Sequence, residues 1–194
     1  MSYYNRREQF LRTLSTIQKT KYKNYEVIVV DDGSLDEHRL EDVEGINLIR
    51  IDPNTKDYIN PCIPFNRAIA AATGDVVILQ NPECLHLGDV VSHAANNVTD
   101  KNYISYECYS FDQFITERLP KKVDEIMMER IKGTLKQLPQ VRPAAGDCGW
   151  YNHSTIKPTG YHFTSAISKR QLDTLGGFDE KFAHGVGFDD DEFL

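Results

Sequence analysis

The sequence lacks the features of several large protein classes. Its four cysteines, Cys62, Cys84, Cys108 and Cys148, are scattered and form no Cys-x-x-Cys pair. This spacing favours reduced, mostly buried thiols over a zinc site or a disulfide framework. The chain has no run of 18 apolar residues, and its first residues have no signal-peptide pattern. We therefore expect a soluble protein located in the cytoplasm.

Basic residues are also in the minority. Lys and Arg number 22 against 29 Asp and Glu, which gives a formal net charge of −7. General nucleic-acid binders and membrane-surface binders have little use for an acidic face, so both classes are disfavoured. A bound divalent cation could offset part of this charge locally. The length of 194 residues and the 40% hydrophobic composition predict one domain with one sizeable core.

Hydrophobic periodicity predicts alternating helices and strands. The order helix, strand, strand, helix, strand in the first 80 residues is typical of a parallel sheet. We expect an α/β fold in which helices flank a mostly parallel sheet. Residues 139–160 contain three prolines, three glycines and the only tryptophan, and are predicted to form a long loop. The predicted helices are 8–17, 65–73, 87–98, 122–138 and 169–175, and the predicted strands are 26–30, 46–51, 75–79, 102–110 and 162–168.

Acidic residues gather in two places. Asp31 and Asp32 directly follow an apolar strand, and open α/β sheets bind ligands at such strand ends. Residues 189–192 are four consecutive acids. Because adjacent carboxylates repel one another, this run indicates a nearby cation or a proton-transfer task.

Together with three other short motifs, these clusters resemble the nucleotide-sugar glycosyltransferases of the GT-A (Rossmann-like) fold, in particular the inverting enzymes of family 2. The resemblance covers nearly the whole chain, and the motifs occur in the order of the family. Each motif alone is weak evidence, but five motifs in the same order argue against a chance match. They are Tyr4-Asn5-Arg6, Val30-Asp31-Asp32-Gly33-Ser34, Asn66-Arg67-Ala68-Ile69 with Gly74-Asp75, Gly176-Gly177-Phe178-Asp179-Glu180, and Asp189-Asp190-Asp191.

The resemblance implies a donor that carries uracil or thymine. In the family, the second aspartate of the Asp-Asp-Gly-Ser turn accepts a hydrogen bond from the base, and a tyrosine stacks on it. These roles fall on Asp32 and Tyr4, and a carboxylate and an aromatic face suit a pyrimidine imide. Asn5, Arg6 and Asp31 are expected to bind the nucleotide as parts of the same motifs. The alternative is an Asx-turn in which Asp31 or Asp32 caps the next segment.

The metal-binding motif of the family is altered here. Family members have Asp-X-Asp after the third strand, which binds Mn²⁺ or Mg²⁺ against the sugar diphosphate. The third strand of this chain leads into Gln80, Asn81 and Glu83 instead. Glu83 is expected to hold the metal, while Gln80 or Asn81 contacts ribose or metal-bound water; one carboxylate suffices when phosphates supply other ligands. The alternative is that Glu83 caps the helix that starts near Leu87.

Inverting transfer needs a carboxylate that takes the proton of the acceptor hydroxyl. In the family this base is the second acid of a pair about ten residues after Gly-Gly-Phe-Asp-Glu. The resemblance therefore implies Asp190 as the base, with Asp189 holding a hydroxyl, and a shift of register by one would select Asp191. The alternative is a solvated acidic helix N-terminus.

The long loop carries the candidates for acceptor binding. Trp150 and Tyr151 could form a platform, because the C–H faces of sugars pack on aromatic rings. The alternative places Trp150 in the core. We expect a glycan or another hydroxyl compound as acceptor and no nucleic-acid partner.

Two other functions fit parts of the pattern. A non-catalytic nucleotide-sugar-binding module would explain Gln80 in place of an acid, and a nucleotidyltransferase has a similar architecture. Family members also have a strand that leads into the Tyr-Asn-Arg segment, whereas only three residues precede Tyr4. We expect this chain to belong to a longer polypeptide with further domains.

Overall fold

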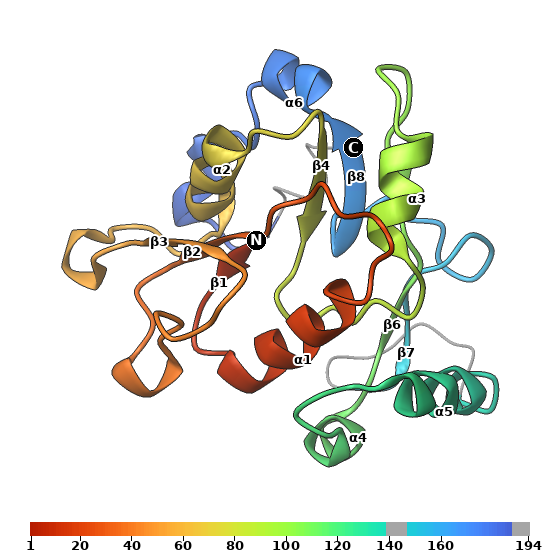
Figure 1. The fold of residues 1–194 in the computed structure, drawn as a ribbon. Coiled ribbons are helices and arrows are strands. Elements are labelled where there is room, and N and C mark those ends of the chain that lie inside the picture. The colour runs from red at the N-terminus through yellow and green to blue at the C-terminus, as the bar shows by residue number, and fades with distance from the viewer. Residues whose placement is uncertain (139–146, 188–194) are drawn as a thin grey trace.

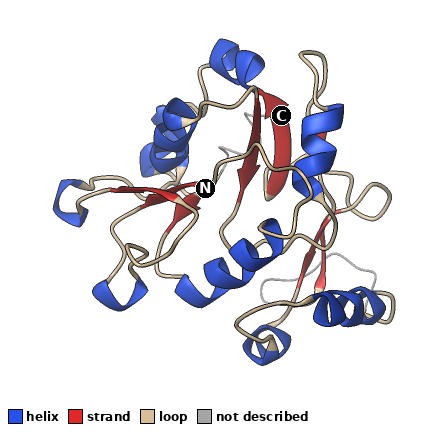
Figure 2. Ribbon diagram, viewed as in Figure 1, coloured by secondary structure: helices blue, strands red, loops and turns tan. Residues whose placement is uncertain are grey.

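The computed structural model describes residues 1–138 and 147–187. Its strands form three sheets, and helices lie beside them (Figures 1 and 2). The first sheet is parallel, in the order β1–β2–β3, and the other two are antiparallel, in the orders β4–β8–β5 and β6–β7. The strands are β1 (Ser2–Tyr3), β2 (Ile28–Asp31), β3 (Asn47–Arg50), β4 (Val76–Gln80), β5 (Ile104–Ser105), β6 (Cys108–Ser110), β7 (Gly149–Asn152) and β8 (Thr164–Ser168).

Six α-helices are present in the described part of the chain. Among the described residues, no helix is long and apolar enough to cross a membrane. The helices are α1 (Arg7–Ile17), α2 (Cys62–Ala71), α3 (Val90–Asn97), α4 (Gln113–Arg118), α5 (Glu125–Leu135) and α6 (Lys169–Leu175), and short 3-10 helices cover Asp36–His38, Pro53–Thr55 and Glu180–His184.

Strand β2 lies between two hydrophobic clusters. All four of its residues are buried. Because successive side chains of a strand point to opposite faces, Ile28 and Val30 join one cluster and Val29 joins the other. Helix α1 supplies Phe10 and other apolar residues to the Val29 side, and α2 supplies Phe65 and others to the opposite side. The parallel sheet is therefore covered on both faces, as a parallel sheet requires.

The α/β fold class predicted from sequence is confirmed, and several boundaries are corrected. Helix α2 begins three residues earlier than predicted, because Pro64 lies in its first turn, where no backbone N–H is needed. The predicted strand 102–110 is two strands in different sheets, separated where the Tyr106 amide donates to the Thr164 carbonyl (2.9 Å). Helix α4 was not predicted, and the predicted loop 139–160 contains strand β7.

The direction of the second sheet differs from the expectation. Strand β4 pairs with β8 in antiparallel register, from Val76 opposite Ser168 to Gln80 opposite Thr164. Strand β8 is fully buried, so its sequence has no alternation that distinguishes a parallel from an antiparallel neighbour. The sheet is therefore parallel only over β1, β2 and β3.

Asn66 joins two of the sequence motifs. Its Nδ2 donates to the Phe178 carbonyl (2.9 Å) and to Glu180 Oε1 (3.0 Å), and its Oδ1 accepts from the Phe178 amide (2.9 Å). Gly177 lies against the side-chain amide of Asn66. Its φ is +78°, and a Cβ added to Gly177 would lie 2.5 Å from Asn66 Oδ1. The Asn-Arg-Ala-Ile and Gly-Gly-Phe-Asp-Glu motifs are thus two halves of one contact that positions the chain leading to residue 187.

We predict that Gly177→Ala lowers the free energy of unfolding by about 3 kcal/mol. The left-handed backbone conformation costs about 1–2 kcal/mol with a side chain, and disturbing the Asn66 hydrogen bonds adds about 1 kcal/mol. Gly176→Ala is the matched control, because φ is +84° there but no atom lies within 4 Å of an added Cβ. Urea denaturation of both variants measures the difference, and equal losses would contradict the proposed steric conflict with Asn66.

Candidate active site

Asp31 shapes the turn at the end of β2. Its side chain is fully buried, and its Oδ1 accepts a hydrogen bond from the Ser34 amide (2.8 Å). Its Oδ2 forms an ion pair with Arg50, which also donates to the Ser34 carbonyl (2.8 Å). The capping role that the sequence left open for Asp31 or Asp32 is therefore seen at Asp31, and both oxygens of this carboxylate are engaged within the protein.

Asp32 faces a different set of partners. Its Oδ1 accepts from the Tyr58 hydroxyl (2.7 Å), and its Oδ2 lies 2.6 Å from Lys56 Nζ. Burial, followed by the hydrogen bond to Asp32, raises the pKa of Tyr58 above its ordinary value. The ring of Tyr4 is half exposed, and Lys56 Nζ lies 4.9 Å from its centroid. The structure therefore brings Tyr4 and Asp32 together around one ammonium group.

The segment that follows Tyr4 connects this turn to the end of β4. The Asn5 amide donates to Ser34 Oγ (3.0 Å), and Asn5 Oδ1 accepts from the Leu35 amide (2.8 Å). Asn5 has a φ of 51°, a conformation that asparagine tolerates better than most residues. The next residue, Arg6, places Nη1 2.6 Å from Glu83 Oε1. Three consecutive residues thus extend from the Asp32 turn to the Glu83 turn.

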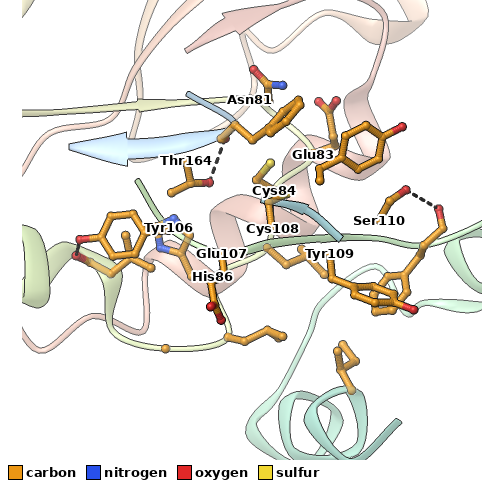
Figure 3. A pocket seen from close by; sticks show the side chains of 18 of the residues that line it. Asn81, Glu83, Cys84, His86, Tyr106, Glu107, Cys108, Tyr109, Ser110 and Thr164 are labelled. Carbon is orange, nitrogen blue, oxygen red and sulfur yellow. Dashed lines mark hydrogen bonds between the residues drawn. The ribbon is translucent and has the colours of Figure 1, made fainter. Parts of the chain in front are cut away.

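The turn after β4 is held by Gln80. Figure 3 shows residues that follow it in this turn, among them Asn81, Glu83 and His86. The Gln80 side chain is buried, Nε2 donates to the Cys84 carbonyl (2.9 Å), and Oε1 accepts from His86 Nε2 (2.7 Å). Both ends of the amide are therefore used inside the turn, whereas ribose or metal-bound water was the expected partner. Asn81 follows Gln80 and lines the cleft that lies beside this turn. Its backbone N–H donates to the Phe163 carbonyl (3.0 Å).

A cleft of about 1100 Å³ lies beside this turn. It extends between α1, the turn after β4, strands β5 to β7 and α5. Asn81 and Glu83 line one part of it, and Trp150 and Tyr151 of β7 line another. Trp150 is half-buried and packs edge-on against Tyr109, with ring centroids 5.0 Å apart. The two predicted acceptor-binding aromatics and the predicted metal ligand therefore share one cavity.

Asp189, Asp190 and Asp191 lie outside the described residues, so their predicted roles stay predictions. The chain that precedes them is anchored. The 3-10 helix Glu180–His184 is fixed near the start of α2, where the Ala183 carbonyl accepts from the Ile59 amide (2.9 Å) and the Asn60 amide (3.0 Å).

Known proteins resemble this chain in sequence and in fold. The family model described as Glycosyl transferase family 2 matches residues 1–159. The chain belongs to this family. A curated relative, the amylovoran biosynthesis glycosyltransferase AmsB of Erwinia amylovora, is 36% identical over 80 residues, which cover 38% of this chain and 26% of AmsB.

A solved structure is similar over most of the chain. It is the mannosyltransferase PcManGT of Pyrobaculum calidifontis in complex with GDP-Man and Mn²⁺, with a TM-score of 0.57 and 17% sequence identity. The match covers 97% of this chain and 48% of PcManGT, so the chain spans about half the length of that protein. At this identity the similarity shows the fold alone, and it supports GT-A architecture for this family 2 domain.

Glu83 is the residue that fits a divalent cation. Its Oε1 is paired with Arg6, whereas its Oε2 is buried and has no hydrogen-bond partner in the described part of the chain. The described residues bring together no group of three or more His, Cys, Asp or Glu side chains that could hold a metal. The site therefore offers one carboxylate oxygen, which suits a cation that takes its other ligands from phosphates and water.

Helix α3 is capped by Asp89, which accepts from the Ser92 amide (3.1 Å), so the alternative in which Glu83 caps this helix is wrong.

The motifs in the sequence do not include Lys56, Tyr58 or Arg50. Lys56 and Tyr58 lie in the loop between β3 and α2, and no periodic pattern assigns a direction to side chains in such a loop. A weak signal was available for Arg50, because a buried aspartate at the end of a strand requires a cation or several donors nearby. A basic residue that ends the neighbouring strand meets this requirement.

The buried His86 makes the stability of the folded protein depend on pH. Burial lowers the pKa of its imidazole from 6.5 to about 4. An unfolded chain therefore takes up a proton on this histidine below about pH 6.5, whereas the folded protein does so only near pH 4. The resulting stability is present above pH 6.5 and is lost as the pH falls toward 4.

We predict that lowering the pH from 7 to 5 reduces the free energy of unfolding by about 2 kcal/mol through His86. His86→Gln keeps a donor for Gln80 Oε1 and should remove this part of the pH dependence. His184→Gln is the control, because that histidine is exposed. Urea denaturation at the two pH values measures the slope, and an unchanged slope in His86→Gln would show that another group is responsible.

Proposed function

We propose that this chain forms the catalytic domain of an inverting glycosyltransferase. It moves a sugar from a UDP- or dTDP-linked donor to an acceptor hydroxyl, in the synthesis of a glycan or polysaccharide. The observation that carries this proposal is the continuous segment Tyr4-Asn5-Arg6, which connects the turn that contains Asp32 and Ser34 with the Glu83 carboxylate. A nucleotide sugar needs such a site, with base recognition at one end and stabilisation of the diphosphate at the other.

The two ends have distinct tasks in this proposal. Asp32 accepts the hydrogen bond of the base N–H, and the exposed ring of Tyr4 stacks on the base. Glu83 holds Mn²⁺ or Mg²⁺ through Oε2, and Arg6 lies beside it to meet the diphosphate. When bound, the cation stabilises the negative charge of the departing diphosphate. Asp31 shapes the turn that presents Asp32, and Gln80 holds the turn that presents Asn81 and Glu83.

The acceptor binds in the cleft next to Glu83. Trp150 and Tyr151 offer aromatic faces in the same cavity, so the acceptor and the diphosphate end of the donor lie near one another. Asp190 takes the proton of the attacking hydroxyl, and Asp189 positions a hydroxyl group. A non-catalytic binding module or a nucleotidyltransferase is disfavoured, because the chain belongs to a family of glycosyl transferases.

We predict that Glu83→Gln weakens the binding of UDP in the presence of Mn²⁺ by at least about tenfold, or 1.4 kcal/mol. The substitution preserves the size of the side chain and removes the charge that binds the cation. Glu107→Gln is the control, because Glu107 lines the same cleft but bonds to Ser154. Calorimetric titration with UDP in the presence of Mn²⁺ or of EDTA tests this prediction. If EDTA leaves the affinity and turnover of the wild-type protein unchanged, a metal role for Glu83 is excluded.

We predict that Asp190→Asn lowers turnover by about 10² to 10⁴-fold while UDP binding changes little. General-base catalysis contributes about this much, and the base acts on the acceptor rather than on the nucleotide. The measurement is release of the nucleoside diphosphate from a panel of nucleotide sugars and acceptors. Loss of turnover in Asp191→Asn but not in Asp190→Asn would move the role by one residue, and normal turnover in both would refute the mechanism.

A further inference from the structure

We propose that Lys56 reads the base of the donor nucleotide together with Asp32. Its ammonium group donates a hydrogen bond to the base carbonyl adjacent to the N–H that Asp32 accepts. This inference rests on the proposed function, because it concerns the same nucleotide site. It assigns base selection to a pair of opposite charges rather than to Asp32 alone.

The position of the ammonium group is the first argument. Lys56 Nζ lies 2.6 Å from Asp32 Oδ2, 4.9 Å from the centroid of Tyr4 and 5.3 Å from the centroid of Tyr58. The Lys56 side chain is 22% exposed and the Asp32 side chain 7% exposed. The cation is therefore held where the carboxylate meets the exposed Tyr4 ring, and it still has access to solvent. A base that stacks on Tyr4 and bonds to Asp32 lies within its reach.

The remaining hydrogen-bonding capacity is the second argument. An ammonium group has three donors, and Asp32 Oδ2 accepts from one of them. A carboxylate has about four acceptor positions, and Tyr58 and Lys56 fill two positions on Asp32. Tyr58 also fixes the carboxylate plane, because its hydroxyl binds the oxygen that Lys56 does not. The pair can thus offer one acceptor and one donor side by side without breaking its own contact.

The chemistry of the bases then decides which nucleotides fit. Uracil and thymine present an N–H beside a carbonyl, which complements a carboxylate beside an ammonium group. Cytosine presents an unprotonated nitrogen and an amino group at the same positions, so both contacts become unfavourable. Adenine has the same disadvantage. Guanine has an N–H beside a carbonyl as well, so the pair separates uracil from cytosine and adenine but not from guanine.

Two other tasks for Lys56 predict different behaviour. As a cation near a nucleotide site, it could bind a phosphate, and its effect would then grow with the number of phosphates. It could also occupy the base position in the free protein, and its removal would then strengthen binding. UMP, UDP and CDP separate these possibilities, because UMP and UDP differ only in phosphate number and UDP and CDP only in the base.

The test is calorimetric titration of wild-type protein and Lys56→Met with the three nucleotides. Losing a hydrogen bond to a charged group typically weakens binding by about 10- to 100-fold. We expect this loss for UMP and for UDP by the same factor, while CDP stays weak, so that the preference for UDP over CDP collapses. Lys56→Arg keeps a cationic donor and should retain most of the preference. Lys101→Met, at an exposed lysine on another loop, should behave as wild type.

Several results would overturn the inference. A larger loss for UDP than for UMP would assign Lys56 to the phosphates, and tighter binding by Lys56→Met would show that the lysine blocks the base site. Unchanged preferences in Lys56→Met, with an unfolding midpoint like that of wild type, would exclude any role in recognition. Failure of the wild-type protein to bind UDP at all would instead refute the proposed function, and the inference with it.

Discussion

The buried carboxylate of Asp31 is the constraint on which the nucleotide end of the site depends. A carboxylate removed from water is costly unless its oxygens are paired, and here a cation and a backbone amide pair them. Arg50 comes from the neighbouring strand and the amide from Ser34, so the chain must fold back on itself immediately after β2. Because neighbouring side chains of an extended chain point in opposite directions, burying Asp31 sends Asp32 to the other side, where Lys56 and Tyr58 meet it.

The same turn fixes the segment that extends to the second sheet. Ser34 Oγ accepts from the Asn5 amide, and this contact directs the chain toward Arg6 and its partner Glu83. The Arg6–Glu83 pair is partly exposed, so its direct contribution to stability is small, on the order of 1 kcal/mol or less. The pair acts mainly on position, because it joins the segment after β1 to the turn after β4.

The sequence predicted those parts of the fold that local patterns determine. Helix α6 was predicted with its observed bounds, and Gly176 was expected to end it. In the structure Gly176 adopts the left-handed conformation after its end, and Ser168 caps its start. Strand direction was not predictable in the same way, since the partly buried strand β4 and the buried strand β8 have no pattern that encodes their partner. The division of 102–110 into β5 and β6 depends on two distant partner strands, β8 for β5 and β7 for β6, which no local window contains.

The candidate site shows the same limit. Motifs identified Tyr4, Asp32 and Glu83. The structure brings Tyr4 and Asp32 together around Lys56, and Glu83 pairs with Arg6 two residues after Tyr4. The motifs did not identify Lys56 and Tyr58, whose loop approaches Asp32 only in the folded chain. The environment of Gln80 was also not predictable, because its partners His86 and the Cys84 carbonyl depend on the shape of the turn.

That environment explains how the turn tolerates the loss of an acid that family members usually have there. An amide both donates and accepts, so Gln80 satisfies the Cys84 carbonyl and the His86 imidazole at once. An ionised aspartate has no donor for the carbonyl, and burial at this position would oppose its charge. Gln80 therefore stabilises the turn without charge, and Glu83 is the carboxylate that this turn places beside the cleft.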